Sequence, residues 1–224
     1  MTAYRLYSYW RSGSSWRARI GLALKGLTYE YVAVNLASDG EQLGEPHLAR
    51  NPMGQVPVLE WTEGGVVRRL AQSLAILELL EERHPEPALY PRDAFLRAQT
   101  RMLAEAINSG IQPFNNQATL KYVKSLLPDG DRPWAAHWIE RGLRSFERAV
   151  QATAGSFAVG DLPTAADCCL VPQLHTARRF DVDLQAFPTL VRIEQACAAL
   201  PAFATALPDR QPDAPPAQPP APAR

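Results

Sequence analysis

The stretch Ser8-Tyr-Trp-Arg-Ser-Gly-Ser-Ser-Trp-Arg-Ala-Arg-Ile20 leads from one regular element into another. Residues 3–9 alternate with the period of two that indicates a short β-strand. From Trp16 to Leu27 the apolar side chains recur instead at helical spacing. Between the two patterns, Arg11–Ser15 is rich in Ser and Gly, so we expect a turn that opens a helix.

The elements that follow define a first domain. Residues 29–36 are rich in aromatic and β-branched side chains, which favours a second strand. Two further runs, 55–61 and 66–70, flank Thr-Glu-Gly-Gly and predict a β-hairpin. Residues 73–82 again show helical spacing. Strand, helix, strand, hairpin and helix in succession predict a small α/β layer domain over residues 1–84.

The rest of the chain reads as helical. A proline-containing linker ends at Pro91, and we expect one long helix over residues 92–126, bent near Pro113. Further helices are predicted over residues 134–153, 164–180 and 189–200. Thr164-Ala-Ala-Asp167 has the spacing of a capping box, which would begin one of these helices. Together they predict an all-helical domain of residues 92–207.

The last segment, residues 208–224, is unusually rich in proline. Seven of its 17 residues are Pro, which cannot donate backbone hydrogen bonds. We therefore expect a disordered tail.

Composition excludes several classes of protein. The 23 basic and 23 acidic residues cancel, which offers no general attraction for nucleic acid or an anionic membrane. No apolar run reaches the roughly 18 residues of a membrane span, and the N-terminus lacks a signal peptide's apolar stretch. Three cysteines, two of them adjacent, suit a reducing compartment, and four scattered histidines lack metal-ligand spacing. We expect a cytoplasmic protein that binds neither metal, membrane nor nucleic acid.

The turn after the first strand has the features of an anion site. Ser12–Ser15 places hydroxyl groups at a helix start, where backbone N–H groups lack intrahelical partners. Arg11, Arg17 and Arg19 crowd the same end, although cations there oppose the helix dipole by roughly 0.3–1 kcal/mol each. A negatively charged ligand would explain this pattern. The alternative is a capping serine among solvated arginines that pair with nearby acids.

Two later segments can extend such a site. Pro57 interrupts the strand pattern of Asn51–Leu59, so that strand should be an edge or contain a special turn. A cis peptide bond before Pro57 would leave the N–H and C=O of Val56 free to pair with an extended peptide. Gln72 and Ser73 then open the next helix, with Ser73 as its cap and both side chains available for a carboxylate. Each segment alone also fits an ordinary turn or cap.

This order of elements resembles the glutathione transferase superfamily, and Ser8–Ile20 resembles the signature of its zeta class, the maleylacetoacetate isomerases. The match spans residues 3–213 and includes Gln55-Val-Pro57, Gln72-Ser73, Gly110–Asn116, Val159–Asp167, Leu170–Gln173, Arg179–Leu184 and Arg210–Asp213. The resemblance implies an α/β thioredoxin-like N-terminal domain followed by an all-α C-terminal domain, the glutathione transferase fold. It also implies a homodimer, with glutathione as the cofactor and a small maleyl keto acid as the substrate.

The resemblance further implies a set of site residues. It assigns catalysis to Ser12, Ser14, Arg11 and Arg179. It assigns glutathione binding to Ser12, Ser14, Ser15, Arg17, Gln42, Gln55, Val56, Pro57, Gln72, Ser73, Gln112, Asn115 and Asn116. Ser12 is the candidate donor to the glutathione sulfur. Arg179 fits equally a surface arginine at a helix end, and Arg17 fits a brace of the turn.

The chain departs from the family at the turn. The family's Ser-Ser-Cys reads Ser12-Gly13-Ser14 here, so a hydroxyl stands at the thiol position. The related bacterial maleylpyruvate isomerases resemble this turn more closely, but they tend to carry His where this chain has Gln112. We favour maleylacetoacetate, an intermediate of tyrosine and phenylalanine catabolism, as the substrate. Maleylpyruvate isomerisation, dehalogenation of small α-halo acids and non-catalytic glutathione binding remain the alternatives.

Overall fold

A four-stranded mixed sheet forms the centre of the N-terminal part in the computed structural model, which describes residues 3–37 and 40–216. The strands are β1 (Tyr4–Ser8), β2 (Tyr29–Ala33), β3 (Val58–Glu63) and β4 (Val66–Ala71). Their order across the sheet is β2-β1-β3-β4. β1 runs parallel to β2 and antiparallel to β3, and β3 and β4 form the predicted hairpin. The predicted thioredoxin-like arrangement is confirmed.

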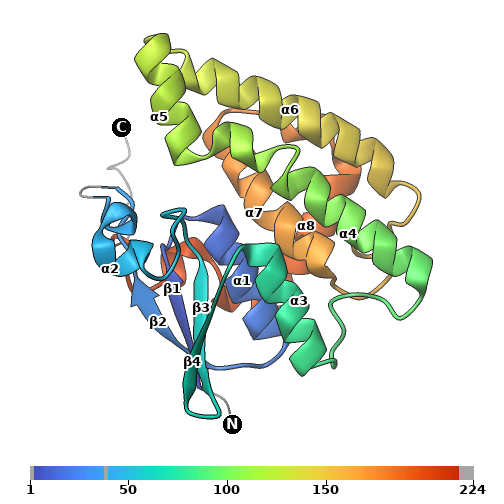
Figure 1. Ribbon diagram of the computed structural model, residues 1–224. Helices are drawn as coiled ribbons and strands as arrows, with labels where there is room; N and C mark the ends of the chain where they lie inside the picture. The colour runs from blue at the N-terminus through green and yellow to red at the C-terminus, as the bar shows by residue number, and fades with distance from the viewer. Residues whose placement is uncertain (1–2, 38–39, 217–224) are drawn as a thin grey trace.

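Two helices cover one face of this sheet (Figure 1). They are α1 (Gly13–Leu24) and α3 (Ser73–Arg83), and they share a buried apolar cluster with β1 and β3. Leu22 of α1 and Ile76 of α3 are fully buried in that cluster. The connection from β2 to β3 carries the 3-10 helix η1 (Glu41–Leu43) and the short helix α2 (Glu45–Leu48), neither of which has a periodic signal in the sequence.

The second part of the chain is helical, as predicted. Its helices are α4 (Ala94–Asn108), α5 (Gln117–Leu126), α6 (Asp131–Val150), α7 (Ala165–Arg179), α8 (Pro188–Ala198) and α9 (Pro201–Thr205). Two 3-10 helices lie between them, η2 (Gln112–Asn115) after α4 and η3 (Leu184–Ala186) after α7, and a third, η4 (Pro208–Arg210), follows α9. α7 packs against both α1 and α4, so one continuous apolar core links the two parts of the chain.

The single long helix predicted over residues 92–126 is wrong. The chain leaves α4 at Asn108, passes through η2 and starts α5 afresh at Gln117. Pro113 lies at the start of η2, where it has no N–H for a helical ladder. The Asn116 side chain then accepts the Thr119 N–H at 2.8 Å, which caps a new helix. A proline followed by a capping residue therefore breaks this segment instead of bending it.

The disordered tail predicted from residue 208 is also wrong as far as Pro216, where the description of the chain ends. Pro208 is buried, and the side-chain amide of Gln211 donates to the Leu207 carbonyl at 2.7 Å. The Asp213 carboxylate accepts the Trp10 N–H at 3.0 Å. The side chains of Gln211 and Asp213 form the hydrogen bonds that proline residues cannot donate. The proline content alone gave no sign of these contacts. Residues 217–224 lie outside the described residues.

Candidate active site

Ser12 caps helix α1 at the turn after β1. Its Oγ accepts the Ser15 N–H at 3.2 Å, and its own N–H donates to the Tyr9 carbonyl at 3.0 Å. The hydroxyl hydrogen of Ser12 has no acceptor among the described residues, so it is available to a ligand. A hydroxyl donor beside a helix N-terminus is suited to stabilising a negatively charged sulfur atom.

The other two serines of the turn differ in their surroundings. Ser14 is half-buried, one residue into α1. Ser15 is completely buried, and its Oγ has no hydrogen-bond partner in the described parts of the chain. A buried hydroxyl without a partner destabilises the folded protein unless a ligand or a water molecule forms a hydrogen bond with it. The turn thus retains unsatisfied polar groups beside the Ser12 hydroxyl.

Helix α3 begins differently from the prediction. Ser73 is not the cap but the first helical residue, and Gln72 precedes it with no side-chain capping bond. Gln72 has φ 71° and ψ 113°, a backbone conformation that L-residues adopt only with strain of about 1–3 kcal/mol. The strained residue leaves the first N–H groups of α3 without a capping side chain, which suits the binding of a carboxylate.

Arg17 joins this helix start to two other helices. Its guanidinium is almost completely buried and donates to the Ser73 Oγ at 3.4 Å and to the Asn108 Oδ1 at 2.7 Å. These bonds hold the start of α3 and the end of α4 against α1, and neither reaches the Ser12 turn that the sequence alternative named. Direct binding of glutathione by Arg17 stays a prediction.

The segment before β3 leaves backbone groups unpaired. The Val56–Pro57 peptide bond is cis, the form considered from the sequence, and β3 pairs only from Val58 onward. The Gln55 carbonyl accepts from His47 Nε2 at 3.0 Å and from Asn51 Nδ2 at 2.8 Å, which holds the segment in place. No hydrogen bond within the described chain uses the Val56 N–H or C=O.

Two glutamine side chains complete this part of the site. Gln72 Nε2 lies 3.5 Å from Gln55 Oε1, so the two predicted residues are neighbours. Gln42 lies in η1, and its buried Oε1 lacks a partner in the described chain. The strained start of α3 at Gln72 and the unpaired backbone of Val56 fit an extended peptide with a terminal carboxylate, such as glutathione. The buried oxygens Ser15 Oγ and Gln42 Oε1, which lack partners in the described chain, are consistent with such a ligand.

Three arginines gather on the side of the α1 turn that faces the helical part. The guanidinium groups of Arg132 and Arg179 both lie over the Phe180 ring, 5.6 and 4.9 Å from its centroid. Desolvation, together with the charges of Arg11 and Arg132, lowers the pKa of the Arg179 guanidinium. Arg132 donates to the Asp181 carboxylate at 2.7 Å and to the Arg179 carbonyl at 3.0 Å. Arg11 and Arg179 have no carboxylate partner within the described chain, and their guanidinium groups lie over the rings of Trp10 and Phe180. Two uncompensated guanidinium groups favour a ligand with carboxylates.

Of these three cations, Arg132 was not predicted as a site residue. It lies 47 residues before Arg179 in sequence. Neither spacing nor a motif relates the two positions, so only the fold brings them together.

The predicted residues of the helical part have varied positions. Gln112 is half-buried at the start of η2, where the structure records no hydrogen bond of its side chain within the described chain. Asn115 Nδ2 donates to the Ile111 carbonyl at 3.0 Å, and Asn116 caps α5. Asn115 and Asn116 therefore stabilise their own loop. Their contact with glutathione stays a prediction.

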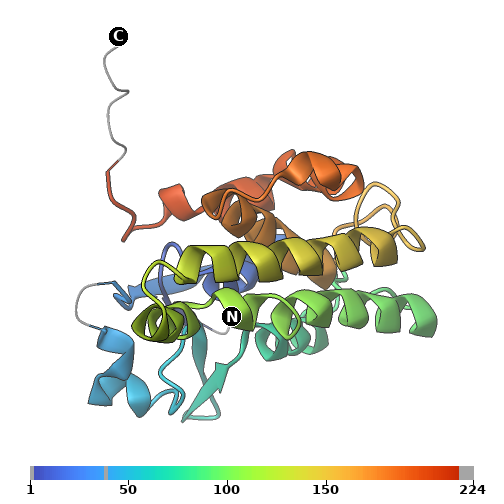
Figure 2. The ribbon, with the colours of Figure 1, turned by 90° about the horizontal axis from the view of Figure 1, so that it is seen from above.

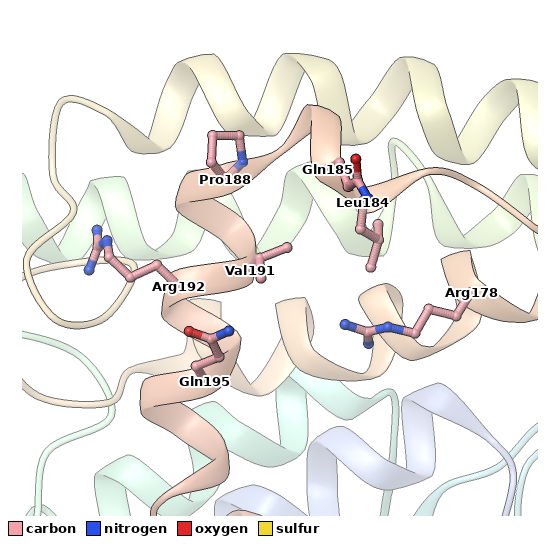
Figure 3. A pocket seen from close by; sticks show the side chains of 7 residues that line it. All are labelled: Arg178, Leu184, Gln185, Pro188, Val191, Arg192 and Gln195. Atoms are coloured by element: carbon pink, nitrogen blue, oxygen red, sulfur yellow. The ribbon is translucent and has the colours of Figure 1, made fainter.

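A separate surface hollow of about 510 Å³ lies along α8 and η3 (Figure 3). It contains none of the predicted site residues. Its two arginines are already engaged, because Arg178 pairs with Glu194 and Arg192 donates to the Gly155 carbonyl at 2.7 Å. No group of three His, Cys, Asp or Glu side chains within residues 3–37 and 40–216 is arranged to hold a metal ion. None of the helices described here is both long and apolar enough to span a membrane.

Comparison with known proteins agrees with this geometry. Residues 11–83 match the family model "Glutathione S-transferase, N-terminal domain". The chain is 48% identical to maleylacetoacetate isomerase of Rattus norvegicus over 211 residues, which cover 94% of each chain. It is 44% identical to maleylpyruvate isomerase of a Ralstonia species over 214 residues, covering 93% of this chain and 99% of that one.

A solved structure is similar in both sequence and fold. Maleylacetoacetate isomerase from Anaeromyxobacter dehalogenans, crystallised with glutathione in its active site, superposes with a TM-score of 0.90 at 58% identity. The alignment covers 96% of this chain and 99% of that one. Because the identity to these enzymes extends over 93–96% of the chain and the fold is shared, the chain belongs to the zeta class of glutathione transferases, the family of the maleylacetoacetate isomerases.

Proposed function

We propose that this protein is a glutathione-dependent isomerase that converts maleylacetoacetate to fumarylacetoacetate in aromatic amino-acid catabolism. The observation that carries the proposal is a pair of arginines without carboxylate partners in the described chain: Arg11, which directly precedes Ser12, and Arg179, which senses the charge of Arg11. A thiolate site next to two guanidinium groups that lie over aromatic rings and pair with no carboxylate of the described chain suits a substrate with two carboxylates. The named activity of relatives that match nearly the whole chain supports the same reaction.

The reaction requires rotation about a conjugated double bond. Bound glutathione would supply a thiolate nucleophile, whose reversible addition turns that double bond into a rotatable single bond. Ser12 would donate its hydroxyl hydrogen to the sulfur. Arg11 and Arg179 would bind the substrate carboxylates and stabilise the negative charge that develops on the conjugated oxygen.

Activation of the thiol contributes only part of the rate. A free thiol with a pKa of about 8.5 is roughly 3% ionised at neutral pH. Complete ionisation therefore gains at most about 30-fold, or about 2 kcal/mol. Positioning and charge stabilisation must supply the remainder, which assigns the larger share to the arginines and to the placement of the turn.

Replacing Ser12 tests the sulfur contact. We expect the wild-type protein to isomerise maleylacetoacetate only when glutathione is present. Ser12→Ala should lower kcat by about 10- to 30-fold, since it removes the donor that favours the thiolate. The same change should raise the pKa of bound glutathione's thiol, followed by its ultraviolet thiolate absorbance. Ser14→Ala tests the rival hydroxyl of the same turn and, if Ser12 is the principal sulfur partner, should leave that pKa nearly unchanged.

Glutathione affinity separates this effect from loss of the binding site. Isothermal titration should show nearly unchanged affinity for Ser12→Ala, whereas Gln72→Ala should weaken binding at the start of α3. Binding of glutathione without turnover of any maleyl acid would instead favour a non-catalytic protein. If only Ser14→Ala raised the thiol pKa, Ser14 would be the sulfur partner.

Maleylpyruvate isomerisation is the second candidate. The turn sequence Ser12-Gly13-Ser14 favours it, as does the 44% identity to a named maleylpyruvate isomerase. Gln112, a neutral side chain where these relatives tend to carry His, favours the longer substrate instead.

We further propose that the chain works as a cytoplasmic homodimer. Exposed apolar side chains on β4 and α4 support an assembly surface: Val66, Val67, Phe95 and Met102. All three cysteines are free and buried, which suits a reducing compartment. Sedimentation at micromolar concentration should give about twice the 24.7 kDa chain mass, and a species of single-chain mass alone would refute the dimer.

A further inference from the structure

The last described residues of the chain reach back to the turn that carries Ser12. Asp213 Oδ2 accepts the Trp10 N–H at 3.0 Å, and Asp213 Oδ1 accepts the Tyr31 hydroxyl at 2.6 Å. Figures 1 and 2 show the red C-terminal segment beside the blue N-terminal strand. The carboxylate thus connects this segment to β2 and to the residue immediately before Arg11.

A buried arginine holds the same turn from within the fold. Arg19 is completely buried and donates to the Trp10 carbonyl at 3.0 Å and to the Tyr9 carbonyl at 3.4 Å. Its Nε donates to the Ala206 carbonyl at 3.2 Å, in the same C-terminal segment. The Tyr9 carbonyl also accepts the Ser12 N–H. A continuous set of hydrogen bonds therefore runs from the C-terminal segment to Ser12.

Charge links the two sides of this arrangement. Arg19 makes its hydrogen bonds to carbonyl and hydroxyl oxygens, none of which carries a full negative charge. Desolvation lowers its pKa to about 10, and Tyr31, Tyr29 and, to a smaller extent, Asp213 oppose that shift. Asp213 therefore accepts the Trp10 N–H directly and adds a smaller, longer-range attraction for the buried guanidinium. Loss of this carboxylate would weaken both constraints on the turn.

We propose that Asp213 is a positioning residue for the reaction, because it fixes the turn on which Arg11 and Ser12 meet the reacting groups. The inference rests on the proposed function. Asp213 would act without contacting the Arg11 guanidinium or the Ser12 hydroxyl, by holding the backbone between them and β1. A displacement of about 1 Å in a reacting geometry can lower a rate by about 100-fold, and a short turn held by few bonds is sensitive to such displacement.

The test replaces Asp213 in the full-length protein. Asp213→Ala should lower kcat for the maleyl acid by 10- to 100-fold while glutathione affinity changes less than threefold. We expect kcat to fall more than glutathione affinity because the predicted contacts with the glutathione backbone and carboxylate lie before β3 and at the start of α3, away from Asp213. Asp209→Ala is the matched control, since Asp209 is exposed in the same segment, and it should retain the wild-type kcat.

A second readout does not require the substrate. Hydrogen exchange of the peptide that contains Trp10 and Ser12 should be faster in Asp213→Ala than in Asp209→Ala. The thiol pKa of bound glutathione should also rise in Asp213→Ala and stay unchanged in Asp209→Ala. Asp213→Asn keeps one carbonyl acceptor and should recover part of the kcat. Tyr31→Phe removes only the second bond and should give a smaller loss, which supplies a milder variant if Asp213→Ala does not fold.

The outcomes separate the two proposals. If the wild-type protein turns over no maleyl acid, the proposed function fails, and the exchange and thiol pKa measurements still test the positioning role. If the wild-type protein does turn over a maleyl acid, a kcat of Asp213→Ala within threefold of wild type would overturn the positioning role of Asp213. A fall in kcat accompanied by a lower melting temperature and a similar fold-loss of glutathione affinity would also overturn it, because that combination would indicate general destabilisation.

Discussion

Asp167→Ala is expected to lower the free energy of unfolding by about 3–5 kcal/mol, a large part of the 5–15 kcal/mol typical of a domain. Asp167 is completely buried at the start of α7. Its carboxylate accepts the Ala158 N–H at 2.8 Å, the Thr164 N–H at 2.7 Å and the Thr164 hydroxyl at 2.9 Å. Removing the acceptor leaves these donors buried without partners, at a cost of about 1–3 kcal/mol for each backbone N–H.

Urea denaturation of wild type and variant measures this loss directly. Asp161→Ala is the matched control, because Asp161 also caps a turn, accepting the Ser156 N–H at 2.9 Å, but is exposed to solvent. We expect the control to lose about 1 kcal/mol or less. A loss below 1 kcal/mol for Asp167→Ala would show that α7 begins stably without the capping box.

The pH dependence of the same measurement has a defined sign. Burial raises the pKa of Asp167 to about 6, against the opposing effect of its three donors. The unfolded value is about 3.9, so folding favours the protonated form of this carboxyl. Its contribution to wild-type stability is therefore complete below about pH 4 and is lost as the pH rises through about 6. The slope in this window should be absent in Asp167→Ala.

Local patterns predicted the regular elements of this protein well. The period-two run before Ser8 and the helical spacing after Trp16 correspond to β1 and α1. The capping box at Thr164 is confirmed as the start of α7. These features are properties of neighbouring residues, so a single sequence carries them. The break at Pro113 was misread because proline is compatible with either a bend or a stop.

Contacts between distant segments could not be predicted in this way. Arg19 occupies a helix that is buried on almost all sides between the sheet and α7, so its position in the helical pattern gave no sign of its carbonyl partners. The bond from Asp213 to Trp10 joins residues 203 positions apart. The grouping of Arg11 with Arg179 was available only through family resemblance. Charged residues that pair across the fold leave no periodic signal.

Arg179→Ala is expected to lower kcat/KM for the maleyl acid by about 30- to 150-fold, or about 2–3 kcal/mol. The loss follows from removing a guanidinium that would bind a carboxylate in a partly desolvated site. Glutathione affinity should stay nearly unchanged, since the arginine lies on the substrate side. Arg178→Ala is the matched control, because Arg178 is adjacent but already paired with Glu194, and its kcat/KM should stay within twofold of wild type.

Parallel assays of the two candidate substrates extend this test. Gln112 is a neutral donor and acceptor, whereas a histidine there could protonate and bring a further cation to the smaller diacid. With Gln112, the fixed positive charge toward the substrate falls to Arg11 and Arg179, which favours maleylacetoacetate. The substrates differ by one methylene, worth about 1–3 kcal/mol of discrimination, so a tenfold preference is measurable. A kcat/KM at least tenfold higher for maleylpyruvate would overturn the choice of substrate but leave the isomerase chemistry, and the expected effect of Arg179→Ala, in place.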